Sequence, residues 1–188
     1  MIIIDDFIPL SYQEDIKRTL LGSGFPWYFT NDVTFGNKAK KHSPANAHSF
    51  RFNNQTTSEY YNAIAPLAHL GAAAANYQFN DVVQCRSFLQ FPINEKFINN
   101  KIDNLHIDLP YDHLVVLYYV FDADGDTIIV DKQRTNNEEE LFCQVSDYNI
   151  IKKVTPKQGR AVIFDGKYYH TAEQPSTGMR CIINFDII

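Results

Sequence analysis

The second half of the sequence is built from short runs of β-branched and aromatic residues separated by turn signals, and this rhythm constrains the fold most. Asp124-Gly125-Asp126 and Pro175-Ser176-Thr177-Gly178 are two such turns. The runs are Val82 to Phe91, Leu114 to Phe121, Thr127 to Val130, Arg160 to Phe164 and Arg180 to Ile187. Many short strands of this kind are typical of a β-sandwich or a jelly roll. We therefore predict a mostly β fold.

Two helices are expected before these strands. Ser11 followed by Glu14 is a capping-box pattern, which predicts a helix through about Leu21 that ends at Gly22. A second helix is expected over residues 56–77, where apolar residues recur at helical spacing, with a bend or break at Pro66 and at Gly71. The predicted fold is thus mostly β with N-terminal helices, which would cover one sheet and leave the mouth of a barrel open.

Short strands are predicted over Ile2 to Ile8 and Trp27 to Thr30, followed by a long polar loop over Thr34 to Asn54. Long loops in compact domains often have a function. The candidates for a lid over the barrel mouth are His42, His48 and Arg51 of this loop, with the neighbouring Trp27 and Tyr28. A solvated loop without such a role is the alternative interpretation.

The length of 188 residues fits one domain, for which we expect a helical support over residues 1–80 and a β core over 81–188. The net charge of −5 argues against a protein that holds nucleic acid through many phosphate contacts. Three cysteines without CxxC spacing suggest neither a disulfide framework nor a zinc ribbon. The start MIIIDDFIPL lacks the features of a secretory signal, and no run reaches the ~20 apolar residues of a membrane span, so we expect a soluble, cytoplasmic protein.

A metal site is indicated by His106-Ile107-Asp108, because an extended chain projects residues i and i+2 from the same face. His170, which lies beyond the turn at Asp165-Gly166, is the candidate third ligand. Two imidazoles and one carboxylate on one face of an octahedron suit iron(II) and leave three positions open. The His-x-Asp pair alone is weak evidence, since it also arises by chance.

Arg180 strengthens this interpretation. It lies ten residues after His170, across a turn near Pro175 to Gly178, so a hairpin would place the two residues opposite each other on adjacent strands. On the last strand, Arg180 shares a face with Ile182 and Asn184. A buried guanidinium needs an anionic partner, and a metal-chelating dicarboxylate would supply one.

The stretches HIDLPYDHLVVLYYVF and GRAVIFDGKYYHTAEQPSTGMRCIINF together resemble the 2-oxoglutarate and iron(II)-dependent oxygenases, in particular their prolyl-4-hydroxylase-like branch with its phage and bacterial members. The resemblance covers roughly Val82 to Ile188 and implies a double-stranded β-helix, a jelly roll of cupin-like type. It implies that His106, Asp108 and His170 bind catalytic iron(II). It also implies that Arg180 and Tyr119 bind the distal carboxylate of 2-oxoglutarate.

The implied reaction uses O2 and 2-oxoglutarate to hydroxylate an unactivated C–H bond. Peptidyl proline is the first substrate expected from the branch, and a small molecule is the alternative. The need for ascorbate stays open.

Two departures from the branch affect this expectation. Ile182 stands where many relatives have Ser or Thr, and Phe91 and Asp103 stand where the branch often has tyrosines. Two other functions remain: a cupin-like barrel that binds a metal or ligand without turnover, and a structural jelly roll in which the histidines are incidental.

Overall fold

Two antiparallel sheets form the frame of the molecule, which a computed structural model describes over residues 1–33, 43–93, 102–135, 142–143 and 147–188. The larger sheet has the strand order β1-β11-β7-β13-β5-β3-β2, with β4 paired to β3. Its strands are β1 (Ile2–Ile4), β2 (Tyr28–Thr30), β3 (Ala45–Phe52), β4 (Gln55–Thr56), β5 (Val82–Gln90), β7 (Leu114–Tyr119), β11 (Ala161–Asp165) and β13 (Arg180–Ile187). The prediction of a mostly β fold with few helices is confirmed.

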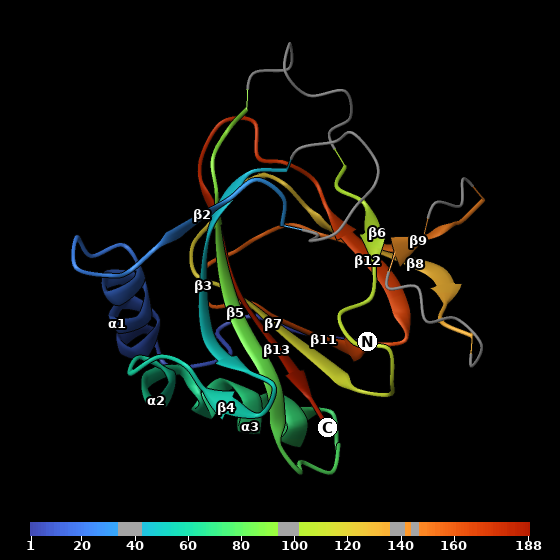
Figure 1. Cartoon of the computed structure of the whole chain (residues 1–188), viewed down its shortest axis with the longest axis horizontal. Coiled ribbons are helices and arrows are strands. Elements are labelled where there is room, and N and C mark those ends of the chain that lie inside the picture. The colour runs from blue at the N-terminus through green and yellow to red at the C-terminus, as the bar shows by residue number, and fades with distance from the viewer. Residues whose placement is uncertain (34–42, 94–101, 136–141, 144–146) are drawn as a thin grey trace.

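The smaller sheet has the order β10-β8-β12-β6-β9 and lies on the opposite side of the larger sheet from the helices (Figure 1). Its strands are β6 (Leu105–His106), β8 (Thr127–Gln133), β9 (Phe142–Cys143), β10 (Ile150–Val154) and β12 (Tyr168–Ala172). Of these, the sequence pattern had indicated only the region of β8. The missed strands include β6 and β12, which carry the two histidines of the candidate site.

The central strands of the larger sheet are buried on both faces. Along β7, Val116 and Tyr118 face a core shared with the helices, whereas Val115, Leu117 and Tyr119 face a second core between the two sheets. This alternation follows from the two-residue period of a strand. The sheet therefore has apolar material on both sides, and the space between the sheets is where a site can form.

The helices pack on the outer face of the larger sheet (Figure 1). They are α1 (Leu10–Leu20), α2 (Tyr61–Ile64) and α3 (Pro66–Ala74). The expected break at Pro66 is confirmed, because α2 ends before it and proline stands at the start of α3. Gly71 does not break α3. A Cβ there would lie 2.5 Å from Cγ2 of Val116, so glycine lets the helix approach β7 closely.

Two further expectations are wrong. Helix α1 begins after Pro9, without a side-chain cap, so Ser11 and Glu14 lie inside the helix and form no capping box. The predicted loop over Thr34 to Asn54 contains strand β3, which pairs with both β2 and β5. Residues 34–42, including His42, lie outside the described part of the chain.

Three of the five side chains proposed for a lid have structural partners instead. His48 is buried on β3, where its ring nitrogens contact Pro26 O and Ser58 Oγ, each at 2.8 Å. Arg51 forms an ion pair with Asp81 at 2.7 Å, and the indole of Trp27 donates to Leu20 O. His48 and Arg51 of β3 therefore have structural roles, because each is held by partners elsewhere in the fold.

Within the described ranges, no helix is long and apolar enough to cross a membrane.

Candidate functional site

Strand register brings the two histidines together. His106 on β6 is the direct cross-strand partner of His170 on β12, and their ring centroids lie 4.6 Å apart. Two side chains directly opposite each other in an antiparallel pair project from the same face of the sheet. This pairing joins two residues that are 64 positions apart in the sequence, so the contact could be seen only in the fold.

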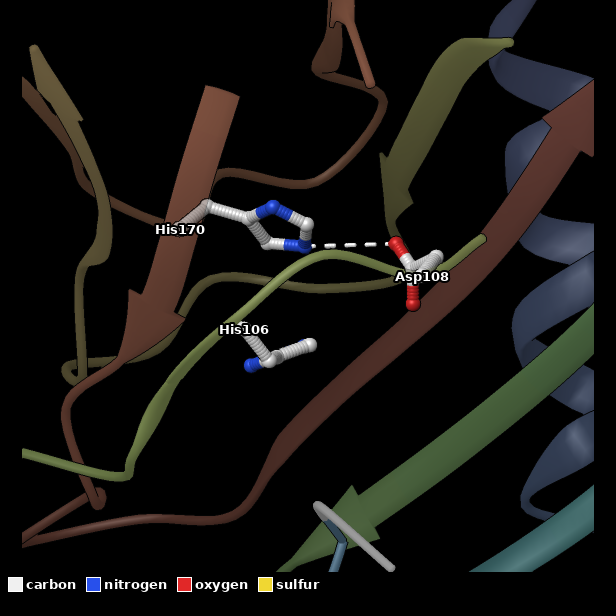
Figure 2. A group of neighbouring side chains, drawn as sticks. All are labelled: His106, Asp108 and His170. Carbon is white, nitrogen blue, oxygen red and sulfur yellow. Dashed lines mark ion pairs between the residues drawn. The ribbon is translucent and has the colours of Figure 1, made fainter. Parts of the chain in front are cut away.

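Asp108 completes a three-residue cluster just beyond the end of β6 (Figure 2). Its Oδ2 lies 3.2 Å from Nε2 of His170, and one possible ligand atom from each of His106, Asp108 and His170 lies within 4.8 Å of the others. The predicted trio is therefore brought together, and its atoms are close enough to bind one ion. A second such set, Asp108, His113 and Asp186, shares the same carboxylate.

The chemistry of the donors fits a divalent metal. Nδ1 of His106 lies 3.0 Å from Asn104 O, and Nδ1 of His170 lies 3.2 Å from Tyr168 O. A carbonyl oxygen can only accept, so each Nδ1 carries the proton. Nε2 is therefore the ring atom of each histidine that a metal would bind, and on His170 it is also the atom that contacts Asp108 Oδ2.

The charge states of the cluster also suit metal binding. Burial and the neighbouring His170 lower the pKa of His106 to about 4, so its ring is neutral at pH 7. Burial alone would raise the pKa of Asp108, but the hydrogen bond to His170 and the charge of Arg86 hold this pKa well below its usual value. The cluster thus presents a carboxylate and a neutral imidazole, which a cation binds without first displacing protons from them.

Arg180 lies in the same cavity, but the expected hairpin is wrong. Strand β12 belongs to the smaller sheet and β13 to the larger one, so Arg180 pairs with Gln90 of β5 and not with His170. The two residues meet across the gap between the sheets, where both line one cavity. The ten-residue spacing reflects a chain that crosses from one sheet to the other.

The guanidinium of Arg180 is buried among neutral acceptors. Its nitrogens donate to Gly125 O at 2.9 Å, to Gln90 Oε1 at 2.8 Å and to Thr127 Oγ1 at 2.8 Å. The residue is 3% exposed, and among the described residues its nearest acidic neighbour is Asp103, which is linked to it through Gln90 and not by a direct ion pair. Three of its five N–H groups are used, so two remain for an anion.

Tyr119 lies beside Arg180 but does not line the cavity. Its hydroxyl donates to Thr127 Oγ1 at 2.7 Å and is 3.2 Å from Val154 O. Thr127, which sequence reasoning missed, stands between Tyr119 and the cavity and also accepts from Arg180. The hydroxyl of Tyr119 thus helps to position Thr127, which lines the cavity.

Other polar residues of the cavity wall were also missed. Asp103 is buried and accepts hydrogen bonds from Ser43, Gln174 and Gln90, and burial raises the pKa of its carboxyl group. Asn184 donates to Asp108 Oδ2 at 3.3 Å. The two-residue period on β13 had placed Asn184 on the face of Arg180, and that signal could have identified it.

A cavity lies between the two sheets, and small-ligand sites are typically concave and mostly apolar with a few polar groups. The metal cluster and Arg180 are both part of its wall, together with apolar groups from Phe88, Leu117 and Ile182. A ligand that contacts the cluster at one end and Arg180 at the other would be enclosed by these apolar side chains.

Solved structures with a similar fold include proteins named as α-ketoglutarate-dependent enzymes, 2OG-Fe(II) oxygenases and prolyl hydroxylases. The non-haem α-ketoglutarate-dependent epimerase SnoN from nogalamycin biosynthesis superposes with a TM-score of 0.69 at 12% identity, over 98% of this chain and 76% of that one. A 2OG-Fe(II) oxygenase family protein from Burkholderia pseudomallei gives 0.66 at 11% identity, over 98% and 83%. A prolyl hydroxylase from Trichoplax adhaerens, solved with a hypoxia-inducible-factor peptide, gives 0.61 at 16% identity, over 99% and 82%.

No family model and no curated protein matches the sequence. At identities of 11–16%, the structural similarity establishes a shared fold. It confirms the resemblance seen in the sequence at that level, since prolyl hydroxylases are among the similar structures.

Proposed function

We propose that this chain is an iron(II) and 2-oxoglutarate-dependent oxygenase with a double-stranded β-helix core, and that residues 1–188 form one oxygenase domain. One observation carries the proposal. Two imidazoles and a carboxylate gather at one end of a cavity whose wall also contains a buried arginine that makes no direct contact with a carboxylate of the described residues. A metal-binding site alone needs no such arginine, and a structural β protein needs neither feature.

His106, Asp108 and His170 would hold the metal. Two histidines and one carboxylate form the ligand set typical of iron(II) oxygenases, with positions left for other ligands. An iron(II) ion held by these residues would supply the O2 chemistry of an oxygenase. The part played by the chain is to fix the histidine tautomers through Asn104 O and Tyr168 O and to keep Asp108 ionised.

Arg180 would bind the distal carboxylate of 2-oxoglutarate. Its planar donor set suits a carboxylate, and the guanidinium is already oriented by Gly125, Gln90 and Thr127. Tyr119 would support this contact by donating to Thr127, rather than bind the carboxylate itself. Leu117 and Ile182 would exclude water from the space between the two ends of the cosubstrate.

The overall reaction balances as follows: 2-oxoglutarate, O2 and one substrate C–H bond give succinate, CO2 and an alcohol. Peptidyl proline is our first proposal for the substrate, because a prolyl hydroxylase bound to a peptide shares the fold. SnoN, solved with iron, α-ketoglutarate and nogalamycin RO, shares the same fold and supports a small molecule as the alternative. A cytoplasmic location and a role for ascorbate stay predictions.

The direct test is iron-dependent succinate production. Protein purified without oxygen and supplied with iron(II), 2-oxoglutarate and candidate substrates should form succinate, and Asp108→Ala should lower the rate at least about a hundredfold, because a lost ligand disables the metal. Asp112→Ala is the matched control, since that nearby carboxylate is exposed and pairs with Arg134. Full turnover in Asp108→Ala would refute the ligand assignment. Metal binding without turnover on any substrate would favour the alternative of a cupin-like barrel that binds a metal or ligand without catalysis.

A further inference from the structure

Arg86 lies behind the candidate metal cluster and is not part of the ligand set. It is on β5, directly opposite Asn184 of β13, so both side chains project from the same face of the larger sheet toward Asp108. One guanidinium nitrogen, Nη2, donates to Asp108 Oδ1 at 2.7 Å and lies 3.5 Å from Asp186 Oδ2. A single cation is thereby placed between two buried carboxylates.

The two oxygens of Asp108 have different partners. Oδ2 lies 3.2 Å from Nε2 of His170 and 3.3 Å from Nδ2 of Asn184, on the side of the histidines. Oδ1 is held by Arg86 on the other side. The carboxylate is therefore presented to the cluster through one oxygen only, and the contact with Arg86 is a charge-assisted hydrogen bond of the stronger kind.

We propose that Arg86 is a positioning residue that keeps Asp108 a one-oxygen ligand, an inference that rests on the proposed function. A six-coordinate ion bound by three side chains has three positions left, of which a bidentate keto acid takes two and O2 the third. A carboxylate that also turned its second oxygen to the ion would occupy one of those three positions. By holding Oδ1 away, Arg86 keeps room for the cosubstrate.

Removal of Arg86 has opposite expected effects on the metal and on the cosubstrate. Without Arg86, Oδ1 of Asp108 loses its charged hydrogen-bond donor, and rotation of Oδ1 toward the ion gives it a new cationic partner. The loss of a positive charge and the gain of a ligand oxygen both favour a bound dication. Metal affinity should therefore be kept or increased, whereas 2-oxoglutarate should bind the metal-loaded protein more weakly. A general structural defect would weaken both.

The experiment measures two affinities by calorimetry without oxygen: Mn(II) for the apo protein, and 2-oxoglutarate for the Mn(II)-loaded protein. In Arg86→Ala we expect Mn(II) affinity to stay within threefold or rise, and 2-oxoglutarate affinity to fall about tenfold or more. Arg86→Lys should restore much of the 2-oxoglutarate affinity, because one nitrogen makes both contacts. Arg51→Ala is the matched control, since Arg51 lies opposite Cys85 on the adjacent strand and has its own 2.7 Å ion pair.

The outcomes separate the two proposals. If the unmodified protein binds neither Mn(II) nor 2-oxoglutarate, the proposed function fails. If it binds both, and Arg86→Ala leaves 2-oxoglutarate affinity unchanged or reduces Mn(II) affinity by as large a factor, then only the role of Arg86 is refuted. Failure of Arg86→Lys to recover more 2-oxoglutarate affinity than Arg86→Ala would refute it as well.

Discussion

At the scale of single residues, the clearest signal is the guanidinium of Arg180, which is 3% exposed and donates to three neutral acceptors. Arg180→Ala should raise the 2-oxoglutarate concentration needed for half-maximal turnover by about tenfold or more, because a charge-assisted contact is worth about 1.5–3 kcal/mol. Mn(II) affinity should change little, since Arg180 does not contact the histidines or Asp108. Succinate assays and metal calorimetry measure the two quantities.

Arg180→Lys serves as the conservative comparison. It keeps the charge but loses the planar set of donors, so its 2-oxoglutarate requirement should lie between those of the native protein and Arg180→Ala. An unchanged requirement in Arg180→Ala would remove the argument for a dicarboxylate. A large loss of Mn(II) affinity would mean that the arginine supports the metal cluster.

The sequence identified the side chains that converge but not how they converge. The i, i+2 spacing of His106 and Asp108 is a local property of an extended chain, and the two residues do lie in one cluster. The cross-strand pairing of His106 with His170 depends on β6, a strand of only two residues, which is too short for any pattern to predict. Arg86 has no local signal at all, because its importance comes from neighbours on other strands.

At the scale of secondary-structure elements, strands buried on both faces were predicted well and polar strands were missed. Strand β13 was predicted with its observed bounds, because most of its residues are apolar or aromatic and turn residues precede it. Strand β3 was taken for a loop, because its polar residues, such as His48 and Arg51, bond to partners distant in the sequence. The β-propensity of a residue reflects how well it fits a half-buried sheet surface, and it does not reveal hydrogen-bond partners that are distant in the sequence.

The contact between α3 and β7 offers a test at this scale. A Cβ on Gly71 would lie 2.5 Å and 2.8 Å from the methyl groups of Val116. Gly71→Ala should lower the free energy of unfolding by up to about 2 kcal/mol, since over-packing costs ~1–3 kcal/mol and the gain in helix propensity offsets ~1 kcal/mol. Urea denaturation measures the change.

The double variant Gly71→Ala with Val116→Ala separates the causes. If the methyl clash is responsible, the double variant should be more stable than the sum of the two single effects predicts. Strict additivity would show that Val116 is not the obstacle. Ala73→Gly on the exposed face of α3 should cost about 1 kcal/mol by propensity alone and should not couple to Val116.

At the scale of the whole molecule, the first strand closes the outer edge of the larger sheet, and charges hold it to the distant half of the chain. Strand β1 pairs with β11, and Asp5, which follows it, accepts from Arg160 Nε at 2.6 Å and from Lys157 Nζ at 2.9 Å. The backbone of Arg160 also accepts from the amide of Tyr119 at 2.9 Å. This ionic contact therefore links the N-terminal strand to the strand that supports the cavity.

The hydrogen bonds from Arg160 and Lys157 lower the pKa of Asp5 from its model-compound value of 3.8. A carboxyl group whose pKa is lower in the folded state stabilises the fold above its unfolded pKa, and this contribution is lost as the pH falls toward the folded pKa. Asp5→Asn should thus lower the free energy of unfolding by about 0.5–1 kcal/mol at pH 7, a modest value because the contact is partly exposed. The difference from the native protein should shrink as the pH falls below about 4.

Urea denaturation of both proteins at pH 7 and pH 3 tests this expectation. Asp15→Asn removes a solvent-exposed ion pair with Arg18 on α1 and should change stability by no more than a few tenths of a kcal/mol at either pH. A deficit in Asp5→Asn that stayed constant between pH 7 and pH 3 would show that packing, rather than charge, holds the first strand. High salt should reduce the pH 7 deficit only in part, because the side chain of Arg160 is only 22% exposed.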